Sequence, residues 1–471
     1  MRKFYDGGRI RELNSLERLY KSNEFTFAVV YGRRRIGKTC LINEFINRGD
    51  KKAIRFTATK GTDAENREIF SHRIFKTLYP DIGSYGIFPS WNSAFEFVAE
   101  ESKKGKLIIF IDEFPYLADA RPAISSELQA FIDTMLLDTD AMLILCGSSM
   151  SFMENQVLGY QSPLYGRRTA QYKIMPLDYY DSAEFLANAN TKDKLLSYAV
   201  TGGVPLYLNI ISKGDTVVDG IKNAFFATDG FMYEEPYNLL KQELREPAVY
   251  NTIIGAIASG ATELKVIADK VKEDKSKVAK YITSLTNLGI LKREVPMFAK
   301  SDSKGVYRVA DNMYRFWYRF VRKEIPAIES GRTRIFETNV EPFITDFMGP
   351  VFEEICMQYL MRLDRAERLP FEIDRIGRWW GSNPATKKHT EVDAIASSAD
   401  DKKIIMCECK WKNEVTGWNV YNSLVERSVL FPGKEIHYYM FSRSGFEDEL
   451  KEEAERNRRL TLVNLDDLFK V

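Results

Sequence analysis

The chain has 471 residues, of which 45% are hydrophobic, 13% aromatic and 28% charged, with a formal net charge of +1. This length exceeds one compact core, so about two to four domains are expected, and the near-zero charge excludes a globally basic nucleic-acid binder. Five cysteines and three histidines fit neither a disulfide framework nor a zinc site, and no apolar run approaches the length of a membrane span. We therefore expect a soluble cytoplasmic protein with reduced thiols and no membrane partner.

A phosphate-binding loop dominates the N-terminal region. An apolar run ends at Gly32, and residues 32–39 read GRRRIGKT, which satisfies G-x-x-x-x-G-K-[ST] at every fixed position. Helical apolar spacing follows in residues 40–46, so loop amides and a helix N-terminus would face a triphosphate. The predicted nucleotide contacts in this segment are Gly32, Arg33, Arg34, Arg35, Ile36, Gly37, Lys38, Thr39 and Cys40. Lys38 is predicted to reach the β- and γ-phosphates of the bound triphosphate, and Thr39 to bind Mg²⁺.

Strands and helices alternate beyond this loop. Strands are expected at residues 53–57, 107–111, 142–147 and 172–177, and the second and third of these are continuous apolar runs. Such runs are typical of strands that are buried on both faces of a parallel sheet. The alternation predicts a doubly wound α/β domain, with its site at the carboxyl ends of the strands.

Two carboxylates end the apolar strand at residues 107–111. We predict that Asp112 helps to hold Mg²⁺ and that Glu113 orients and deprotonates the attacking water. Ser148, which leaves the next apolar strand, could contact the γ-phosphate or this water, or could simply form a turn. Arg167 and Arg168 follow on a loop that contains proline and glycine. Either could be an arginine finger, in cis or in trans, and a solvated surface pair is the alternative.

The order of these motifs resembles the archaeal-type P-loop ATPases of the AAA+/STAND group. The resemblance covers roughly the first half of the chain and rests on GRRRIGKT, LIIFIDEF, CGSS, PLYGRR and TGGVPLYL. It implies ATP as the nucleotide, an ATPase core in residues 1–180 and a helical lid in residues 181–245. It further implies an adenine contact near residues 4–9, and a Gly-x-Pro element at residues 203–205 where the lid meets the nucleotide.

Residues 246–322 predict a winged helix-turn-helix that ends in an aromatic-rich helix. Three short helices precede two strands; they are expected at residues 249–258, 263–271, 276–288, 290–293 and 306–309. The third helix has an apolar face and a face that carries Lys277 and Lys280. That cationic face could enter a DNA groove, with support from the polar tip at residues 301–304, or the module could be a regulatory lid. Residues 323–345 are expected to be a linker.

Residues 346–471 predict a second α/β region with a hydrolytic arrangement. Strands at residues 389–396 and 404–411 flank a polar turn whose centre would place Asp393 opposite Glu408. Lys410 shares the face of Glu408, because side chains alternate along a strand. Asp393 and Glu408 could hold Mg²⁺ while Lys410 orients water, and Glu354 on the preceding helix could be a further metal ligand.

This pattern is similar to the PD-(D/E)xK nuclease superfamily, which has a restriction-endonuclease-like α/β fold, and to an uncharacterised domain often fused to archaeal-type ATPases. Residues 376–380 and 408–411 strengthen the match, whereas Val392 stands where the superfamily often has proline. The resulting hypothesis is an ATPase whose nucleotide state controls a winged helix and a nuclease-like domain on DNA. The alternative is a STAND-like signalling or scaffold switch with a non-cleaving C-terminal domain. A homo-oligomeric motor, in which a second subunit supplies the arginine, is a third possibility.

Overall fold

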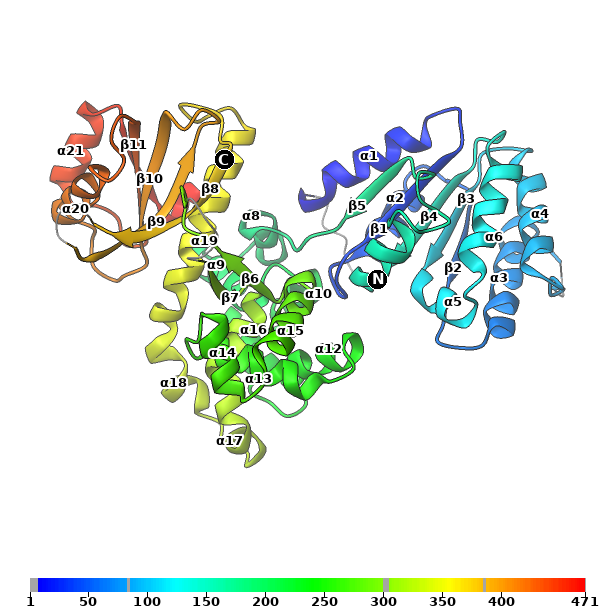
Figure 1. Cartoon of the computed structure of the whole chain (residues 1–471), viewed down its shortest axis with the longest axis horizontal. Helices are drawn as coiled ribbons and strands as arrows, with labels where there is room; N and C mark the ends of the chain where they lie inside the picture. The colour runs from blue at the N-terminus through cyan, green and yellow to red at the C-terminus, as the bar shows by residue number, and fades with distance from the viewer. Residues whose placement is uncertain (1–6, 83–84, 300–304, 384–386, 471) are drawn as a thin grey trace. The chain divides into compact units, whose positions relative to one another are not determined.

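The structure is a computed structural model that describes residues 7–82, 85–299, 305–383 and 387–470. It forms two compact units, which are described separately (Figure 1). The first consists of Met1–Pro176 with Val204–Leu206, and the second of Leu177–Gly203 with Tyr207–Val471. The chain therefore leaves the first unit after Pro176 and returns to it only for residues 204–206.

The first unit is built on a five-stranded parallel sheet in the order β2-β3-β4-β1-β5. Its strands are β1 (Thr26–Tyr31), β2 (Ala53–Thr57), β3 (Ile108–Asp112), β4 (Met142–Gly147) and β5 (Ala170–Lys173). Every residue of β1, β3 and β4 is buried, as expected for central strands of a sheet that is covered on both faces. The predicted α/β class is thus confirmed, although β5 begins and ends earlier than the predicted strand at residues 172–177.

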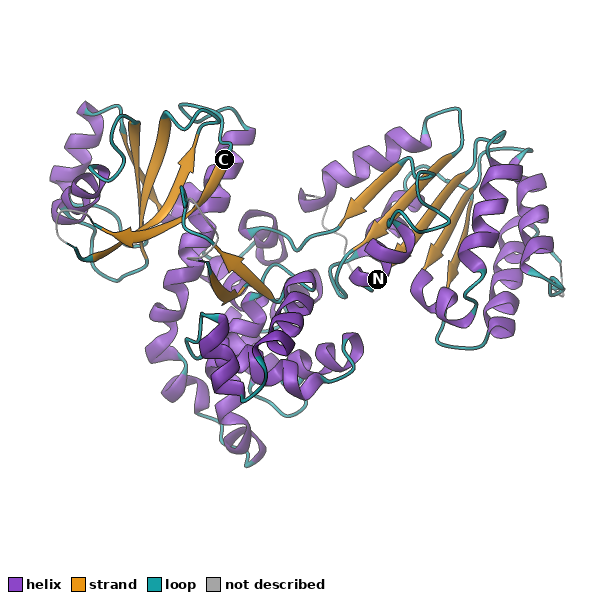
Figure 2. Ribbon diagram, viewed as in Figure 1, coloured by secondary structure: helices purple, strands orange, loops and turns teal. Residues whose placement is uncertain are grey.

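Helices cover both faces of this sheet (Figure 2). One face packs against α1 (Ile10–Tyr20) and α2 (Lys38–Asn47). The other packs against α3 (Asp63–Leu78), α4 (Trp91–Ser102), α5 (Phe114–Ala120) and α6 (Ile124–Phe131). Strand alternation produces the two cores: in β1, Val30 packs with the α2 side and Val29 with the opposite side.

The second unit begins with helices and continues into a three-helix module. The first helices are α8 (Tyr179–Ser182), α9 (Thr191–Thr201), α10 (Pro205–Ile211), whose first two residues belong to the first unit, α11 (Val217–Phe225) and α12 (Glu235–Glu243). The three-helix module contains α13 (Pro247–Ala258), α14 (Leu264–Val271), α15 (Lys275–Asn287) and the antiparallel ribbon of β6 (Leu291–Glu294) and β7 (Val306–Val309). This is the predicted order of elements. The predicted ribbon tip at residues 301–304 lies outside the described residues.

The segment that follows the module is helical. It contains α16 (Asn312–Phe316), α17 (Ile325–Glu329) and α18 (Ile335–Asn339). Lys222 Nζ of α11 lies 2.5 Å from Glu337 Oε1 of α18, and Phe336 packs on Phe226 with ring centroids 5.9 Å apart. Within residues 323–345, the range expected to be a linker, α18 thus contacts the helices at the start of this unit through Phe336 and Glu337.

A second sheet forms the C-terminal part of the second unit, in the order β12-β11-β10-β9-β8. Its strands are β8 (Arg375–Ser382), β9 (His389–Ser397), β10 (Lys403–Lys410), β11 (Glu435–Ser442) and β12 (Leu460–Asn464). Pairing is antiparallel from β8 to β10 and parallel from β10 to β12, so the sheet is mixed. The long helix α19 (Ile344–Arg365) packs on one face, and α20 (Trp418–Ser428) and α21 (Asp448–Arg456) supply core residues to the other.

Across the described ranges of the chain, no helix combines the length and the apolar composition that a membrane crossing requires.

Candidate active sites

The phosphate loop connects the carboxyl end of β1 to the N-terminus of α2, which begins at Lys38. A Cβ atom on Gly32 would lie 2.5 Å from the carbonyl oxygen of Ile174 and 2.6 Å from Ile36 Cδ1, so this position excludes any side chain. The buried guanidinium of Arg9 donates to the carbonyl oxygens of Ile36 at 3.3 Å and Met175 at 2.7 Å. The loop is thus held against the segment that follows β5.

Lys38 is buried beneath this loop. Its Nζ donates to the carbonyl oxygens of Gly32 at 2.9 Å and Arg33 at 2.8 Å. Burial lowers the pKa of Lys38, and the nearby carboxylates of Asp112 and Glu113 oppose that shift. Gly37, which directly precedes the helix, has a left-handed backbone conformation. Arg35 within the loop has a positive φ as well. Thr39 and Cys40 follow in the first turn of α2, where both are exposed.

The predicted acidic residues lie next to the loop. Thr39 Oγ1 donates to Asp112 Oδ2 at 2.8 Å, so a hydroxyl and a carboxylate oxygen meet at the end of β3. Hard oxygen donors of this kind are what Mg²⁺ prefers. Ser148 Oγ donates to Glu113 Oε2 at 2.8 Å, and Glu113 has a left-handed backbone with φ of 51°. The structure therefore brings Thr39, Asp112, Glu113 and Ser148 together.

Arg167 does not join this group. It precedes β5, which runs parallel to β1 with Ala28 paired to Ala170, so it lies at the edge where the strands begin. The phosphate loop lies at the opposite edge, after β1 ends. Both carboxylate oxygens of Asp133 accept hydrogen bonds from Arg167 at 2.7 Å. The structure therefore does not support Arg167 as an arginine finger within its own chain, because the length of the strands lies between Arg167 and the loop.

The Gly-x-Pro element approaches the phosphate loop through its proline. A Cβ atom on Gly37 would lie 3.9 Å from Pro205 Cγ, so Pro205 is a neighbour of the loop inside the first unit. Two residues earlier, the carbonyl oxygen of Gly203 accepts a hydrogen bond from the amide of Leu177 at 2.9 Å, inside the second unit. Of the predicted adenine contacts, residues 4–6 lie outside the described residues, and Gly7–Arg9 form a single helical turn.

A second cluster forms in the C-terminal sheet. The described register ends where Cys407 pairs with Ala394, and Glu408 and Asp393 are the next residues along the two strands, near enough for their charges to interact. Asp393 Oδ2 accepts a hydrogen bond from the amide of Cys409 at 2.8 Å. Beside it, the pairing of β9 with β8 shifts by one residue, which is a β-bulge of the kind found next to active sites.

Two cations hold the carboxylate of Glu408. Lys410 Nζ contacts Oε1, and Arg427 Nη2 on α20 contacts Oε2 at 2.6 Å. Burial opposes the charge of Lys410, but Glu408 and Asp393 outweigh this and raise the pKa of Lys410. The sequence offered no signal for Arg427, because it lies 17 residues beyond Lys410 on a helix whose packing only the fold defines.

The helix acid that faces this cluster is Glu353. Burial and the charges of Glu408 and Glu353 raise the pKa of Asp393 to about 7, so these three carboxylates interact. Burial also raises the pKa of Glu353. Within the described part of the chain, no three acidic, histidine or cysteine side chains are already arranged to hold a metal ion. The three carboxylates nevertheless supply only oxygen donors, which suit Mg²⁺.

Glu354, the residue predicted for this role, is directed elsewhere. Its Oε1 atom lies 2.9 Å from Lys292 Nζ on β6 and 3.0 Å from Arg315 Nη2 on α16. Burial alone would raise the pKa of Glu354, but these two cations lower it to about 2. Adjacent residues on a helix point about 100° apart, so Glu353 and Glu354 face different partners. The sequence alone could not decide between them.

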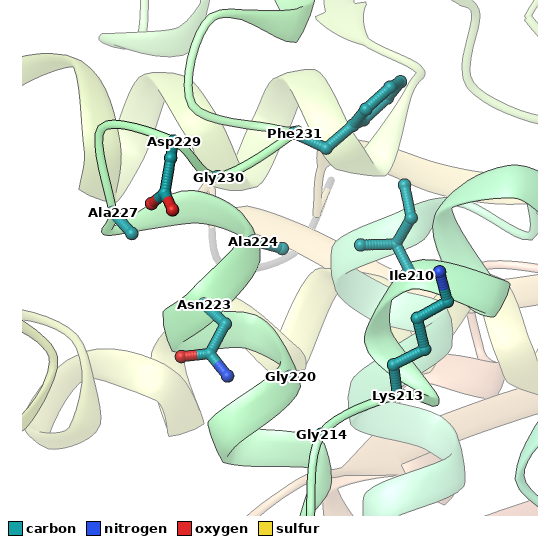
Figure 3. Close-up of a pocket in the computed structure, with 10 residues that line it drawn as sticks. All are labelled: Ile210, Lys213, Gly214, Gly220, Asn223, Ala224, Ala227, Asp229, Gly230 and Phe231. Atoms are coloured by element: carbon teal, nitrogen blue, oxygen red, sulfur yellow. The ribbon is translucent and has the colours of Figure 1, made fainter.

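A separate pocket of about 320 Å³ lies among the helices at the start of the second unit (Figure 3). Its lining residues are Ile210, Lys213, Gly214, Gly220, Asn223, Ala224, Ala227, Asp229, Gly230 and Phe231. None of the predicted site residues is among them.

Comparisons with known proteins match two separate parts of the chain. Residues 4–211 match the family described as an ATPase domain predominantly from Archaea, and residues 317–421 match archaeal and bacterial proteins of unknown function. The uncharacterised protein MJECL04 of Methanocaldococcus jannaschii is 32% identical over 425 residues, which are 90% of this chain and 91% of that protein.

Two solved structures are also similar in part. The Walker-type ATPase PABY2304 of Pyrococcus abyssi is 20% identical with a TM-score of 0.49, covering 67% of this chain and 96% of that one. The Aeropyrum pernix ORC1 protein, solved in complex with DNA, is 16% identical with a TM-score of 0.34, covering 71% of this chain and 93% of that one.

Proposed function

Because the chain belongs to the family of MJECL04 and its residues 4–211 match the ATPase domain found predominantly in Archaea, we propose that it binds and hydrolyses ATP at the phosphate loop with Glu113 as the general base. The observation that carries this proposal is the convergence of Lys38, Asp112 and Glu113 at one end of the parallel sheet. Thr39 and Asp112 would hold Mg²⁺, which supplies positive charge to the phosphate oxygens when it is bound.

Each group has a distinct task in this mechanism. The loop amides and the N-terminus of α2 would bind the phosphates, while Lys38 would turn from the loop carbonyls toward the β- and γ-phosphates. Glu113 would accept a proton from the attacking water as the bond between the γ-phosphorus and its bridging oxygen breaks. The hydrogen bond from Ser148 would hold Glu113 in the orientation that this transfer needs.

The direct test is ATP turnover by Lys38→Ala. We expect phosphate release to fall to the background of the assay, because the variant loses the cation that contacts the β- and γ-phosphates. The exposed Arg73→Ala of α3 is the matched control, since this residue lies outside the predicted site. Unchanged turnover in Lys38→Ala would place the hydrolytic site elsewhere.

For the C-terminal sheet we propose a Mg²⁺-dependent phosphodiesterase site that acts on DNA. Its support is the group of Asp393, Glu408 and Glu353 with Lys410 beside them. The carboxylates would hold the ion, and Lys410 would orient the attacking water or steady charge on the scissile phosphate.

DNA binding is proposed for the exposed face of α15. Asp274 caps this helix by accepting hydrogen bonds from the amides of Ser276 and Lys277. Lys275, Lys277 and Lys280 are exposed, whereas Val278, Ile282 and Leu285 form its buried face. A cationic face of this kind would contact phosphates beside a groove.

A buried ion-pair network supports coupling between the three-helix module and the C-terminal site. Arg378 on β8 contacts Glu294 of the ribbon at 2.9 Å and Glu353 of α19 at 2.6 Å, while its backbone carbonyl accepts from the amide of Met297 at 2.9 Å. The side chain of Arg378 is only 10% exposed. Movement of the ribbon would therefore change the charge balance around Glu353, which in turn faces Asp393.

Plasmid nicking by wild type and Asp393→Ala, in Mg²⁺ and in Mn²⁺, tests the proposed phosphodiesterase. We expect nicked circles from the wild type and none from the variant, because the variant loses a carboxylate ligand. Absence of cleavage by wild type on duplex DNA, single-stranded DNA and RNA would contradict the proposal.

One observation favours the alternative, a STAND-like switch with a non-cleaving C-terminal domain. Both oxygens of Glu408 are held by cations, Lys410 on one side and Arg427 on the other. A carboxylate so neutralised is a weaker metal ligand, so this site could bind a nucleic acid or protein without cutting it. The nicking assay separates the two functions.

We also propose a cytoplasmic protein that can form homo-oligomers. Free thiols at all five cysteines suit a reducing compartment. Arg167 lies partly exposed beside Asp133, and from there it could act only on the site of another subunit. Sizing with and without ATP, together with turnover by Arg167→Ala, tests this trans role.

A further inference from the structure

We infer that Arg34 supplies, within its own chain, the positive charge that the transferred phosphoryl group requires, and that Tyr116 positions it. This inference deepens the proposed ATP hydrolysis and rests on it. It gives a specific task to Arg34, one of the loop residues between Gly32 and Gly37 whose identity the motif leaves open.

Arg34 is tied to the element that carries the catalytic carboxylates. Its Nη2 atom donates to the phenol oxygen of Tyr116 at 2.6 Å, and its guanidinium carbon lies 6.0 Å from the centre of that ring. Tyr116 lies in the first turn of α5, and its amide donates to the carbonyl oxygen of Glu113 at 2.9 Å. The loop arginine is thus connected to the backbone that sets the orientation of Glu113.

Arg34 also belongs to the loop that encloses the site lysine. Lys38 Nζ donates to the carbonyl oxygens of Gly32 at 2.9 Å and Arg33 at 2.8 Å, the two residues before Arg34. Thr39, which follows Lys38, donates to Asp112 at 2.8 Å, so the loop and the carboxylates at the end of β3 are in direct contact. A γ-phosphate held by Lys38 would be within the field of Arg34.

Phosphoryl transfer needs such a cation. Negative charge spreads over the equatorial oxygens of the transferred group, and a planar guanidinium can contact two of them at once. Arg167 does not meet this need in its own chain, because it lies at the opposite edge of the sheet. Arg34 is at the correct edge.

Tyr116 is suited to position an arginine rather than to bind substrate. Its hydroxyl accepts the Arg34 hydrogen bond, and Lys60 Nζ lies 5.2 Å from the centre of its ring. The electron-rich faces of aromatic rings attract cations, so the ring can hold positive charge close to the site. We assign a catalytic role to Arg34 and a positioning role to Tyr116.

The test compares ATP turnover and nucleotide affinity in Arg34→Ala, Arg34→Lys and Tyr116→Phe, with Arg73→Ala as the control. We expect Arg34→Ala to lower kcat by about 10²- to 10³-fold and to leave the Kd for ATP within about threefold. Binding of ADP with aluminium fluoride should weaken far more than binding of ATP. Arg34→Lys should recover part of kcat, and Tyr116→Phe should lose about tenfold through misplacement of Arg34.

Subunit mixing distinguishes action within the chain from action on a neighbour. An equimolar mixture of Arg34→Ala and Lys38→Ala should show no gain over the sum of the separate activities, because neither chain has both groups. A gain on mixing, or kcat of Arg34→Ala equal to that of the control, would overturn the inference. Absence of ATP turnover in wild type would instead refute the proposed hydrolysis itself, and equal loss of ATP and ADP–aluminium fluoride binding would reduce Arg34 to a ground-state contact.

Discussion

Adjacent residues in this protein can belong to different electrostatic systems. Glu353 interacts with Asp393 and shares Arg378 with the ribbon, whereas Glu354 is enclosed by Lys292 and Arg315. Burial raises the pKa of Glu353 although Arg378 opposes this shift, whereas at Glu354 the cations Arg315 and Lys292 outweigh burial and lower the pKa. At the residue scale, adjacent helical residues point in different directions, so Glu353 is a candidate metal ligand while Glu354 belongs to a structural ion pair.

Glu354→Gln should destabilise the second unit by about 3 kcal/mol near neutral pH, because the partly buried Arg315 and Lys292 both lose this carboxylate, and only Lys292 keeps another in Glu294. The pKa of Glu354 in the folded protein, about 2, lies below its ordinary value. The ionised group therefore stabilises the fold above about pH 4.5, and this contribution is lost as pH falls toward about 2. Urea unfolding at several pH values should show the difference between wild type and variant narrowing below about pH 4.5. A difference independent of pH would contradict this assignment.

At the scale of elements, a close backbone contact lies where the chain enters and leaves the second unit. Gly203 has φ of 72°, and a Cβ atom there would lie 1.9 Å from the carbonyl oxygen of Leu177. The carbonyl oxygen of Gly203 in turn accepts from the amide of Leu177. Leu177 is followed by Asp178, which pairs with Arg362 of α19 at 2.7 Å. The Gly-x-Pro element is thus joined to the long helix of the C-terminal region.

Gly203→Ala should perturb this contact strongly, whereas Gly202→Ala is the matched control. Gly202 also has a positive φ, of 63°, but a Cβ atom there would meet only ordinary contacts at 3.5 Å or more. We expect about 1 kcal/mol of destabilisation for Gly202→Ala and more than about 3 kcal/mol for Gly203→Ala, because only the second adds a backbone clash to the unfavourable φ. Thermal unfolding of both variants measures the difference. Equal losses would show that φ alone sets the cost.

At the scale of the whole molecule, the chain combines a parallel-sheet unit that holds the phosphate loop with a unit that holds the carboxylate cluster. The Gly-x-Pro segment connects them covalently. Pro205 lies next to the loop, and the carbonyl oxygen of Gly203 accepts a hydrogen bond from the amide of Leu177. We propose that nucleotide-dependent changes at the loop reach the second unit through this segment.

This coupling predicts that nucleotide state alters the action of the second unit on DNA. Plasmid nicking by wild type should change at least threefold on addition of ATP, while nicking by Lys38→Ala should not respond, because the variant cannot engage the nucleotide phosphates. Asp393→Ala should hydrolyse ATP as wild type does. Equal responses of wild type and Lys38→Ala to ATP would contradict coupling through the phosphate loop.

Local patterns in the sequence were enough to predict the parallel α/β unit, the phosphate loop with Asp112 and Glu113, and the nearness of Asp393 to Glu408. Strand burial, loop motifs and hairpin register depend on residues close together in the chain, so they can be read before folding is known. The sequence predicted Arg34 as a nucleotide contact but not its contact with Tyr116, and it assigned no role to Tyr116, Arg378 or Arg427. Their partners are distant along the chain and meet only after packing.

The phosphate loop was thus determined by the sequence itself, since eight consecutive residues form it. Only the tertiary structure decided which edge of the sheet receives Arg167, which of two adjacent glutamates faces Asp393, and which cations hold Glu408. These outcomes depend on strand direction, helical phase and long-range packing, none of which is specified by neighbouring residues alone.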